Sequence, residues 1–277
     1  MGTPEFGAIV LEKLIKSGYK PFLVITEPDK PVGRDQTITP PAIKILAEKY
    51  KIPVVQPVKI ADFSDQLEKL KPDLGIIVAY GQILPKNILT IPHYGFINVH
   101  PSLLPRWRGS SPIQYAILNG DKKTGVTIIR ISEKLDAGPI LTQKEIEIDP
   151  EETFSSLHNK LATLGADLLI ETLPKLLAGK LPPLMQDETR ATYTKILKRD
   201  DGKIDWQKPA EEIERQIRAF NPWPGTYTFY KDKRLKILKA ELSGNHELII
   251  KEVQLEGRNP MSFEEFLRGH PDFKIKE

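Results

Sequence analysis

Two continuous apolar runs constrain the fold of this chain more than any other feature. They read DLGIIVAY at residues 73–80 and GFINVH at residues 95–100. Strands that are apolar on both faces are typical of parallel sheets covered by helices on both sides. Helical and extended patterns alternate around them, at residues 4–17, 21–26, 42–50, 52–57 and 62–70. The alternation predicts βαβ units and an α/β fold, a Rossmann-like and mostly parallel sheet.

The pattern changes in the second half of the chain. Extended runs at residues 124–131 and 138–148 flank the predicted sheet, and an apolar stripe at helical spacing follows, made of Phe154, Leu157, Leu161, Leu164 and Leu168. Such a stripe is best explained by core packing. Residues 181–205 have the polar composition of a linker. Residues 206–277 hold one short helical segment and three strand-like runs. We therefore expect a domain at 1–180, a linker, and a small β domain at 206–277.

Composition narrows the class of protein. The 277 residues are 40% hydrophobic and 28% charged, carry a net charge of +3 and include no cysteine. A chain without cysteine has no disulfide and no thiolate metal site. The apolar runs are too short to span a bilayer, and the first residues do not resemble a signal peptide. We expect a cytoplasmic protein with no membrane partner, and the mildly basic charge is compatible with a polyanionic ligand.

The densest group of chemically active residues is NVHPSLLPRWRG, at residues 98–109. In an open α/β sheet, ligands bind at the carboxyl ends of the strands. Asn98 and His100 are two residues apart on one strand, so their side chains point to the same side. An amide can stabilise an oxyanion and an imidazole can accept a proton. Asp136, in the later stretch SEKLDAGPI, could orient the imidazole. Structural roles for all three, including a turn at Asp136, stay open from the residues alone.

Several other kinds of site are not supported by the sequence. There is no G-x-S-x-G, no G-x-G-x-x-G and no phosphate loop, and the five histidines lack the spacing of metal ligands. We therefore expect no resident metal and no dinucleotide.

The segment GFINVHPSLLPRWRG, continued to KLDAGPIL, resembles the signature of the folate-dependent formyltransferase family: Asn-x-His, Ser-Leu-Leu-Pro, then Leu-Asp-x-Gly in the same order. The stretches GTPEF, TEPDKPVGR and FNPWPGTY resemble the branch of that family that acts on aminoacylated initiator tRNA. The resemblance implies transfer of a formyl group from 10-formyltetrahydrofolate to the amino group of methionyl-initiator tRNA, without a covalent enzyme intermediate. It also implies an OB-like C-terminal domain that binds the tRNA, and we expect a monomer.

The resemblance assigns roles to individual residues. Asn98 and His100 would stabilise the oxyanion and move the amine proton, and Asp136 would orient His100. The positions that match the folate site are Ser102, Leu103, Leu104, Pro105, Ala79, Tyr80 and Gly81. The positions expected to contact tRNA are Arg34, Arg106 and Arg108. For Arg106 and Arg108, contact with the glutamate tail of the folate or packing at the surface stays open.

This sequence departs from the family pattern at three places. Asp35-Gln36-Thr37 is less basic than the same stretch in many relatives, which weakens the expected loop contact. Relatives have a β-strand before GTPEF, central in the strand order 3-2-1-4-5, and we hypothesise that the natural start lies upstream of Met1. Between Leu242 and Glu247 the β domain is several tens of residues shorter, so we expect a truncated barrel.

Two rival functions share parts of this pattern. One is formyl transfer to an amino-sugar nucleotide or to glycinamide ribonucleotide, which would use the same Asn98, His100 and Asp136. The extended loop at residues 28–41 and the FNPWP segment argue against it. The other is a non-catalytic RNA-binding protein that kept the fold.

Overall fold

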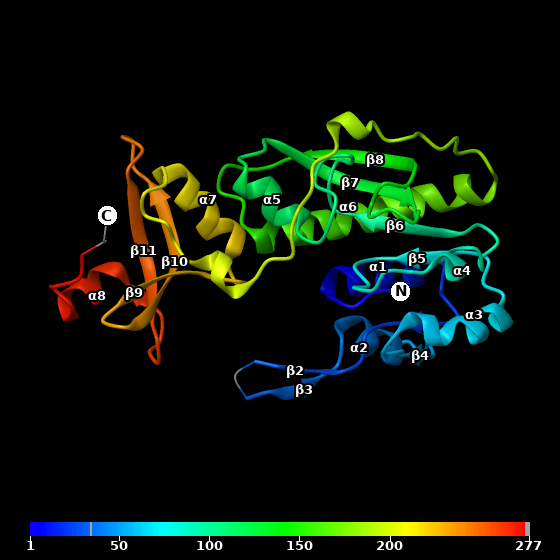
Figure 1. Ribbon diagram of the computed structural model, residues 1–277, viewed down its shortest axis with the longest axis horizontal. Helices are drawn as coiled ribbons and strands as arrows, with labels where there is room; N and C mark the ends of the chain where they lie inside the picture. Colours follow the sequence, from blue (N-terminus) through cyan, green and yellow to red (C-terminus); the bar gives the residue numbers. More distant parts are fainter. Residues whose placement is uncertain (34, 275–277) are drawn as a thin grey trace. The chain divides into compact units, whose positions relative to one another are not determined.

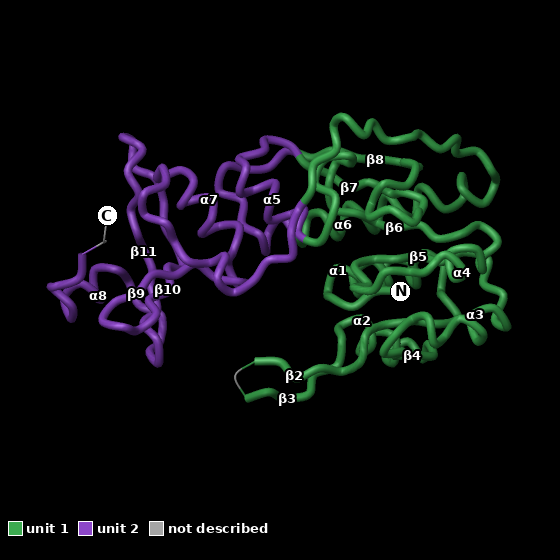
Figure 2. The backbone as a smooth tube through the Cα atoms, viewed as in Figure 1, with its two compact units in different colours: residues 1–110, 124–146, 158–193 green, residues 111–123, 147–157, 194–277 purple. Residues whose placement is uncertain are grey.

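The computed structural model describes residues 1–33 and 35–274, which form two compact units (Figures 1 and 2). Unit 1 contains residues 1–110, 124–146 and 158–193, and unit 2 contains residues 111–123, 147–157 and 194–277. The units are discontinuous in sequence, unlike the expected domains. Residues 181–193, expected to be linker, belong to the compact unit 1. No helix among the described residues is long and apolar enough to cross a membrane.

Unit 1 alternates helices and strands as the sequence predicted. The helices are α1 (Glu5–Lys16), α2 (Ala42–Lys49), α3 (Ser64–Leu70), α4 (Lys86–Leu89) and most of α6 (Phe154–Leu177), with 3-10 turns at Ile60–Phe63 and Glu188–Arg190. The strands are β1 (Val24–Ile25), β2 (Lys30–Val32), β3 (Thr37–Thr39), β4 (Val54–Val55), β5 (Gly75–Ile77), β6 (Phe96–His100), and nearly all of β7 (Lys123–Arg130) and β8 (Ile140–Glu147). The short β2–β3 hairpin, in a segment expected to be a loop, was not predicted.

Local sequence signals explain the boundaries of α1. Pro4 precedes the helix, where its missing N–H costs nothing, and the helix ends at Lys16, with Ser17 as its C-cap before Gly18. Gly18 has a φ of +86°, a conformation that favours glycine at a helix end. Val10, Leu11 and Leu14 form the buried face. Each helix of this kind covers the sheet because its apolar residues recur every three or four positions.

The strands of unit 1 pair mostly in parallel, and the antiparallel direction begins at β7. β1 pairs with β4 and β5 pairs with β6, both in parallel, but β6 pairs with β7 in the antiparallel direction. β8 lies at the edge beside β7, and most of its residues are partly or fully exposed. Antiparallel strands tolerate one solvated face, which explains the more polar sequence of this part.

Met1 and Gly2 lie between β1 and β5, at the expected central position. The Gly2 N–H donates to the carbonyl of Ile25 at 3.1 Å, and the Val78 N–H donates to the carbonyl of Met1 at 2.9 Å. Gly2 also forms a parallel bridge with Val78. These bonds have the pattern of a parallel ladder, so the two residues act as the end of a strand that joins the two parallel pairs.

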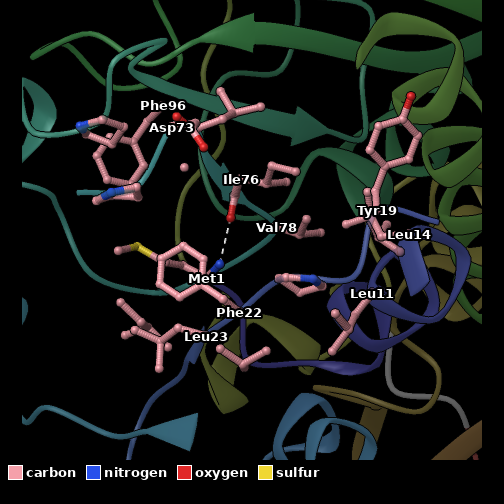
Figure 3. Close-up of a pocket in the computed structure, with 18 of the residues that line it drawn as sticks. Met1, Leu11, Leu14, Tyr19, Phe22, Leu23, Asp73, Ile76, Val78 and Phe96 are labelled. Atoms are coloured by element: carbon pink, nitrogen blue, oxygen red, sulfur yellow. Dashed lines mark hydrogen bonds between the residues drawn. The ribbon is translucent and has the colours of Figure 1, made fainter. Parts of the chain in front are cut away.

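A cavity of about 550 Å³ continues the line of this short segment (Figure 3). Apolar side chains line it, including Leu11 and Leu14 of α1, Leu23 just before β1, and Phe96 of β6. The amide of Ile76 faces the same side, because the alternate amide of Gly75 bonds to Gly95 of the loop that leads into β6. The cavity therefore has apolar walls and a backbone edge.

The α-amine of Met1 is buried at the inner end of this cavity, where it donates to the carbonyl of Ile76 at 2.6 Å. Burial lowers the pKa of this amine from 8.0 to about 5, because the charged form loses its hydration. The unfolded chain binds a proton here below pH 8, whereas the folded chain binds one only below pH 5. The free energy of unfolding should therefore rise with pH between these values, by up to about 4 kcal/mol.

We predict that three apolar β-branched residues added before Met1 will stabilise the protein and flatten this pH dependence. The addition removes the buried amine and places extended chain in the cavity, so the midpoint of thermal unfolding should rise by roughly 3–8 °C. Thermal unfolding followed by circular dichroism from pH 5 to 8 measures both effects. Acetylation of Met1 is the control, since it removes the charge without filling the cavity. An extended protein less stable than the acetylated one would contradict the prediction.

Unit 2 is built on a four-stranded antiparallel sheet. Its strands, in spatial order, are β12 (Met261–Ser262), β11 (Leu248–Leu255), β10 (Lys233–Leu242) and β9 (Thr226–Tyr230). Its helices are α5 (Pro112–Leu118), α7 (Ala210–Phe220) and α8 (Phe263–Gly269), with a 3-10 turn at Arg199–Gly202. α5 and α8 were not predicted.

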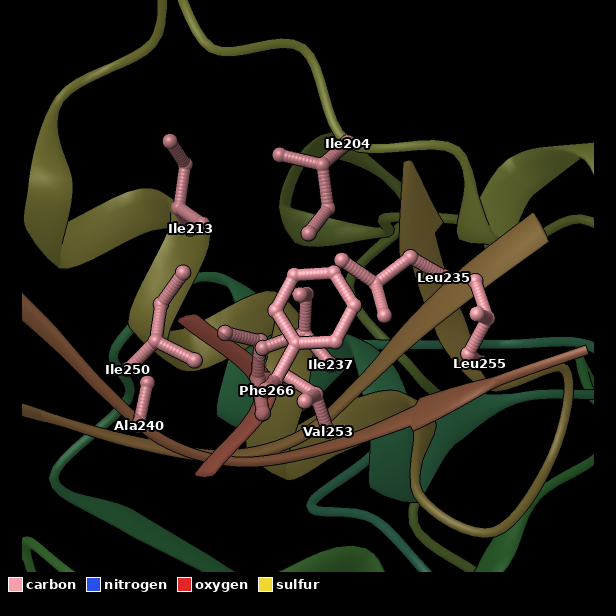
Figure 4. Packing of buried hydrophobic residues seen from close by; sticks show 10 residues of the cluster. Ile204, Ile213, Leu235, Ile237, Ala240, Ile250, Val253, Leu255 and Phe266 are labelled. Carbon is pink, nitrogen blue, oxygen red and sulfur yellow. The ribbon is translucent and has the colours of Figure 1, made fainter. Parts of the chain in front are cut away.

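The core of unit 2 surrounds Phe266 of α8 (Figure 4). Leu235, Ile237 and Val253 of the sheet and Ile213 of α7 pack in the same cluster, and Phe266 is fully buried. β10 and β11 are joined by a tight turn in which the Ser243 N–H donates to the carbonyl of Glu247 at 2.8 Å. The tight turn lies where the sequence predicted a shortened domain. The sheet is a meander, and the OB-like barrel remains a sequence-based expectation.

Candidate active site

Strand β6 positions Asn98 and His100 on the same side of the sheet, as predicted. The strand is buried along its whole length between β5 and β7, and His100 lies opposite Thr127 in the antiparallel register. Only 9% of Asn98 and 4% of His100 is exposed. Polar side chains buried to this extent need specific partners.

Asp136 meets both residues from the loop between β7 and β8. Its Oδ2 accepts a hydrogen bond from the Gly109 N–H at 2.8 Å and lies 3.7 Å from the Nδ1 of His100. Its Oδ1 lies 3.5 Å from the Nδ2 of Asn98. The structure thus brings Asp136 next to Asn98 and His100, although Asp136 and Asn98 are 38 positions apart in the sequence. The carboxylate stands where it can stabilise a protonated His100.

The loop that carries Asp136 has a constrained backbone. Asp136 adopts a φ of +48°, which is uncommon for residues other than glycine. At Gly138 a side chain would collide with the carbonyl oxygen of Arg130, so only glycine fits there. The loop therefore returns to β8 along one path, and this path aims the carboxylate at β6.

The neutral tautomer of His100 is set by Trp107. The Nε2 of His100 lies 3.0 Å from the carbonyl oxygen of Trp107, which can only accept a hydrogen bond. The Nε2 must therefore carry the proton, and the lone pair of the neutral ring lies on Nδ1, toward Asp136. Sequence reasoning assigned the orientation of His100 to Asp136 alone and missed this backbone group. Trp107 has a φ of +63°, and no feature of the sequence predicted that conformation.

The loop at residues 102–105, expected to hold folate, is fixed by two side chains that the sequence did not single out. The hydroxyl of Thr127 donates to the carbonyl of Ser102 at 2.6 Å and accepts from the Leu104 N–H at 3.1 Å. Gln143 donates to the carbonyl of Leu104 and to the Thr127 hydroxyl. Ser102 and Leu104 are buried, whereas Leu103 and Pro105 are partly exposed. Hydrogen bonds hold the loop at Ser102 and Leu104, and its partly exposed residues are apolar.

The other expected folate positions follow β5. Ala79 and Gly81 are exposed and have φ values of +49° and +90°, so the chain turns sharply at the carboxyl end of the strand. Tyr80 between them is buried, its hydroxyl has no hydrogen-bond partner, and burial raises its pKa to about 12. The side chain of Tyr80 belongs to the core, and Ala79 and Gly81 present mainly backbone groups.

The three arginines expected at the tRNA differ in their placement. Arg34 lies outside the described residues. Arg106 is exposed, and its guanidinium lies 4.2 Å from the centre of the Trp107 ring. Arg108 is only 1% exposed, and its guanidinium donates to the carboxylate of Glu188. The hydrogen bond to Glu188, whose side chain is 61% exposed, raises the pKa of the buried Arg108 guanidinium. The placement of Arg108 therefore does not support the expected contact with tRNA.

No group of three or more histidine, aspartate or glutamate side chains within the described part of the chain could hold a metal ion. The chemistry available around Asn98 and His100 is that of one amide, one imidazole and one carboxylate. Such a set can stabilise an oxyanion and transfer a proton.

Comparison with known proteins agrees with this chemistry. Residues 1–173 match the family model described as formyl transferase, and residues 196–247 match that of the formyl transferase C-terminal domain. A methionyl-tRNA formyltransferase of Geobacillus sp. (strain WCH70) is 47% identical over 295 aligned residues, covering 97% of this chain and 93% of the relative. The chain belongs to the methionyl-tRNA formyltransferase family. A member from Bacillus velezensis (strain DSM 23117 / BGSC 10A6 / LMG 26770 / FZB42) is 45% identical with the same coverage.

Solved structures show the same fold at lower identity. The N-formyltransferase from Helicobacter canadensis, in complex with folinic acid and dTDP-3-aminofucose, has a TM-score of 0.65 at 21% identity, covering 87% of this chain and 86% of that one. A methionyl-tRNA formyltransferase from Clostridium thermocellum has a TM-score of 0.56 at 20% identity, covering 76% and 91%. The alignment with the Geobacillus member of the methionyl-tRNA formyltransferase family spans 295 positions, more than the 277 residues here, so that relative contains residues without a counterpart.

We predict that Thr127→Val will destabilise the protein and loosen the loop at residues 102–105. The substitution keeps the size of the side chain but leaves the buried Ser102 carbonyl and Leu104 N–H without their partner, at a cost of about 2–3 kcal/mol. Thr124→Val on the same strand is a matched control, because the hydroxyl of Thr124 is also buried but has no partner. Urea denaturation followed by circular dichroism measures both variants. Equal losses of stability would show that the Thr127 contacts do not hold the loop.

Proposed function

We propose that the protein transfers the formyl group of 10-formyltetrahydrofolate to the amino group of methionyl-initiator tRNA. Membership of the methionyl-tRNA formyltransferase family supports this function. The observation that carries it is the meeting of Asn98, His100 and Asp136 at the carboxyl end of β6. In this reaction a new C–N bond forms to the methionine nitrogen, the bond from the formyl carbon to N10 of the folate breaks, and the amine proton replaces the formyl group on N10.

The three side chains supply the two things that this reaction requires. The amide of Asn98 can donate to the formyl oxygen as it becomes an oxyanion, which stabilises the tetrahedral intermediate. The Nδ1 of His100 holds the lone pair, because the Nε2 proton is committed to Trp107. We assign Nδ1 as the atom that takes the amine proton. The nearby carboxylate of Asp136 then stabilises the imidazolium, and His100 returns the proton to the leaving nitrogen.

The residues at the ends of β5 and β6 fit a flat heterocyclic co-substrate. The exposed backbone of Ala79 and Gly81 offers hydrogen-bonding groups, and the carboxylate of Glu27 lies beside Gly81. Leu103 and Pro105 offer partly exposed apolar surface on a loop that Thr127 fixes. Bound folate supplies the formyl group, and the chain supplies its position. Ser102 and Leu104 of the same loop are buried and are the residues that Thr127 contacts.

Binding of the tRNA would be mainly electrostatic. Arg106 is the exposed arginine of the segment that follows the folate loop, and every residue of strands β2 and β3, which flank Arg34, is exposed. In unit 2, the guanidinium of Arg234 lies 4.1 Å from the centre of the Tyr227 ring, and Lys236 is exposed on the same strand. Contacts of lysine and arginine with phosphates weaken as salt rises. The affinity for tRNA should fall with ionic strength more than the affinity for folate.

Formylation assays with methionyl-tRNA, an amino-sugar nucleotide and glycinamide ribonucleotide test the acceptor. We expect product with methionyl-tRNA alone. Product with either of the other acceptors alone would assign the protein to a rival branch. A folded protein that binds tRNA and forms no product with any acceptor would be the non-catalytic alternative.

We predict that His100→Ala will lower the turnover number by roughly 10²–10⁴-fold, since the amine loses its proton acceptor. Binding of methionyl-tRNA, measured by filter retention, should stay within about threefold of the wild type, because His100 is buried and does not carry the electrostatic attraction. Turnover equal to that of the wild type would remove His100 from the mechanism.

A further inference from the structure

We propose that Gln186 and Arg108 are positioning residues, which hold Asp136 in place for the reaction. Residue 186 lies in the segment that composition marks as a linker. In the structure, residues 184–193 of this segment pack as part of unit 1, beside the loop of Asp136. The inference rests on the proposed function, and it concerns how the catalytic carboxylate is aimed.

Gln186 bonds directly to the backbone on both sides of Ala137. Its Nε2 donates to the carbonyl of Asp136 at 2.8 Å and to the carbonyl of Gly138 at 2.7 Å. Only 8% of Gln186 is exposed. Both N–H groups of one amide are thus used to fix the turn at the residue whose side chain faces Asn98 and His100. A side chain that served only to cover the loop would not need this two-point contact.

Arg108 fixes the orientation of the Gln186 amide. The Nε and Nη2 of Arg108 donate to the Oε1 of Gln186 at 3.1 and 2.9 Å. A reversed amide would place its NH₂ against the guanidinium and its oxygen against two carbonyls, so only the observed orientation is favourable. The carboxylate of Glu188 balances the buried charge of Arg108, and this pairing lowers the pKa of Glu188. The order of contacts is therefore Glu188, Arg108, Gln186, and then the Asp136 loop.

The same segment also holds the group that sets the tautomer of His100. The Trp107 N–H donates to the hydroxyl of Thr192 at 2.9 Å, and the Arg108 N–H donates to the carbonyl of Thr192 at 2.9 Å. Residues 186–193 therefore contact the backbone at Asp136 and at Trp107, the two residues that face His100. Asp136 and Trp107 are both in left-handed backbone conformations, which persist only where surrounding contacts hold them.

The first test is a pair of substitutions at Gln186. Gln186→Leu removes both contacts, and Gln186→Glu keeps an acceptor for Arg108 but cannot donate to the two carbonyls. Both should lower the turnover number by roughly 10–100-fold. The KM for methionyl-tRNA and for 10-formyltetrahydrofolate should change by less than about threefold. Asp187→Asn, at the exposed neighbouring position, is the control and should retain wild-type activity. If Gln186→Glu matched the wild type, donation to the loop would have no role.

The second test is a double-mutant cycle with Asp136→Ala under single-turnover conditions. If Gln186 acts only through Asp136, Gln186→Leu should have less than about a threefold effect once the carboxylate is gone. If the rate losses of Gln186→Leu and Asp136→Ala multiplied in the double variant, the proposal would be overturned. An inactive wild-type protein would instead reject the proposed function, so the two failures are distinct.

A measurement without substrate completes the design. The Gly109 N–H donates to Asp136, so its hydrogen exchange, followed by NMR, reports the position of the carboxylate. We expect Gln186→Leu to speed exchange at Gly109 toward the rate seen in Asp136→Ala, with the melting temperature within a few degrees of wild type. Unchanged protection at Gly109 would show that Asp136 is held by other contacts, and the proposal would fail.

Discussion

The candidate active site depends on one partly buried carboxylate, that of Asp136, which contacts groups from several parts of the chain. It accepts the Gly109 N–H, faces the imidazole of His100 and lies near the amide of Asn98. A carboxylate removed from water is stable only if such partners surround it. Strand β6, the loop after Trp107 and the loop before β8 must therefore all adopt their places before the site exists.

Sequence patterns predicted the parts of this arrangement that depend on periodicity and on local order. Continuous apolar runs located β5 and β6, and the two-residue spacing placed Asn98 and His100 on one side. The family resemblance then identified Asp136 as their partner. α8 could also have been found, because Ser262 and Glu265 form a capping box of the S-x-x-E kind.

The contacts that hold the site could not be read in the same way, because they join positions far apart in sequence. Arg108 in an arginine-rich segment resembles a residue that faces RNA, yet 78 positions separate it from Gln186, the partner that turns it inward. Gln186 belongs to a polar stretch without periodicity, which composition alone assigns to a linker. The backbone conformation of Trp107 depends on Thr192, and its sequence neighbours do not indicate it.

The buried amine of Met1 has a practical consequence for work with this protein. Residues joined to the nitrogen of Met1 would begin beside the Ile76 carbonyl, at the cavity between β1 and β5. The residues next to Met1 would act as part of the sheet. Their sequence would alter yield and melting temperature. A flexible glycine-serine tag and a tag of β-branched residues would therefore give proteins of different stability.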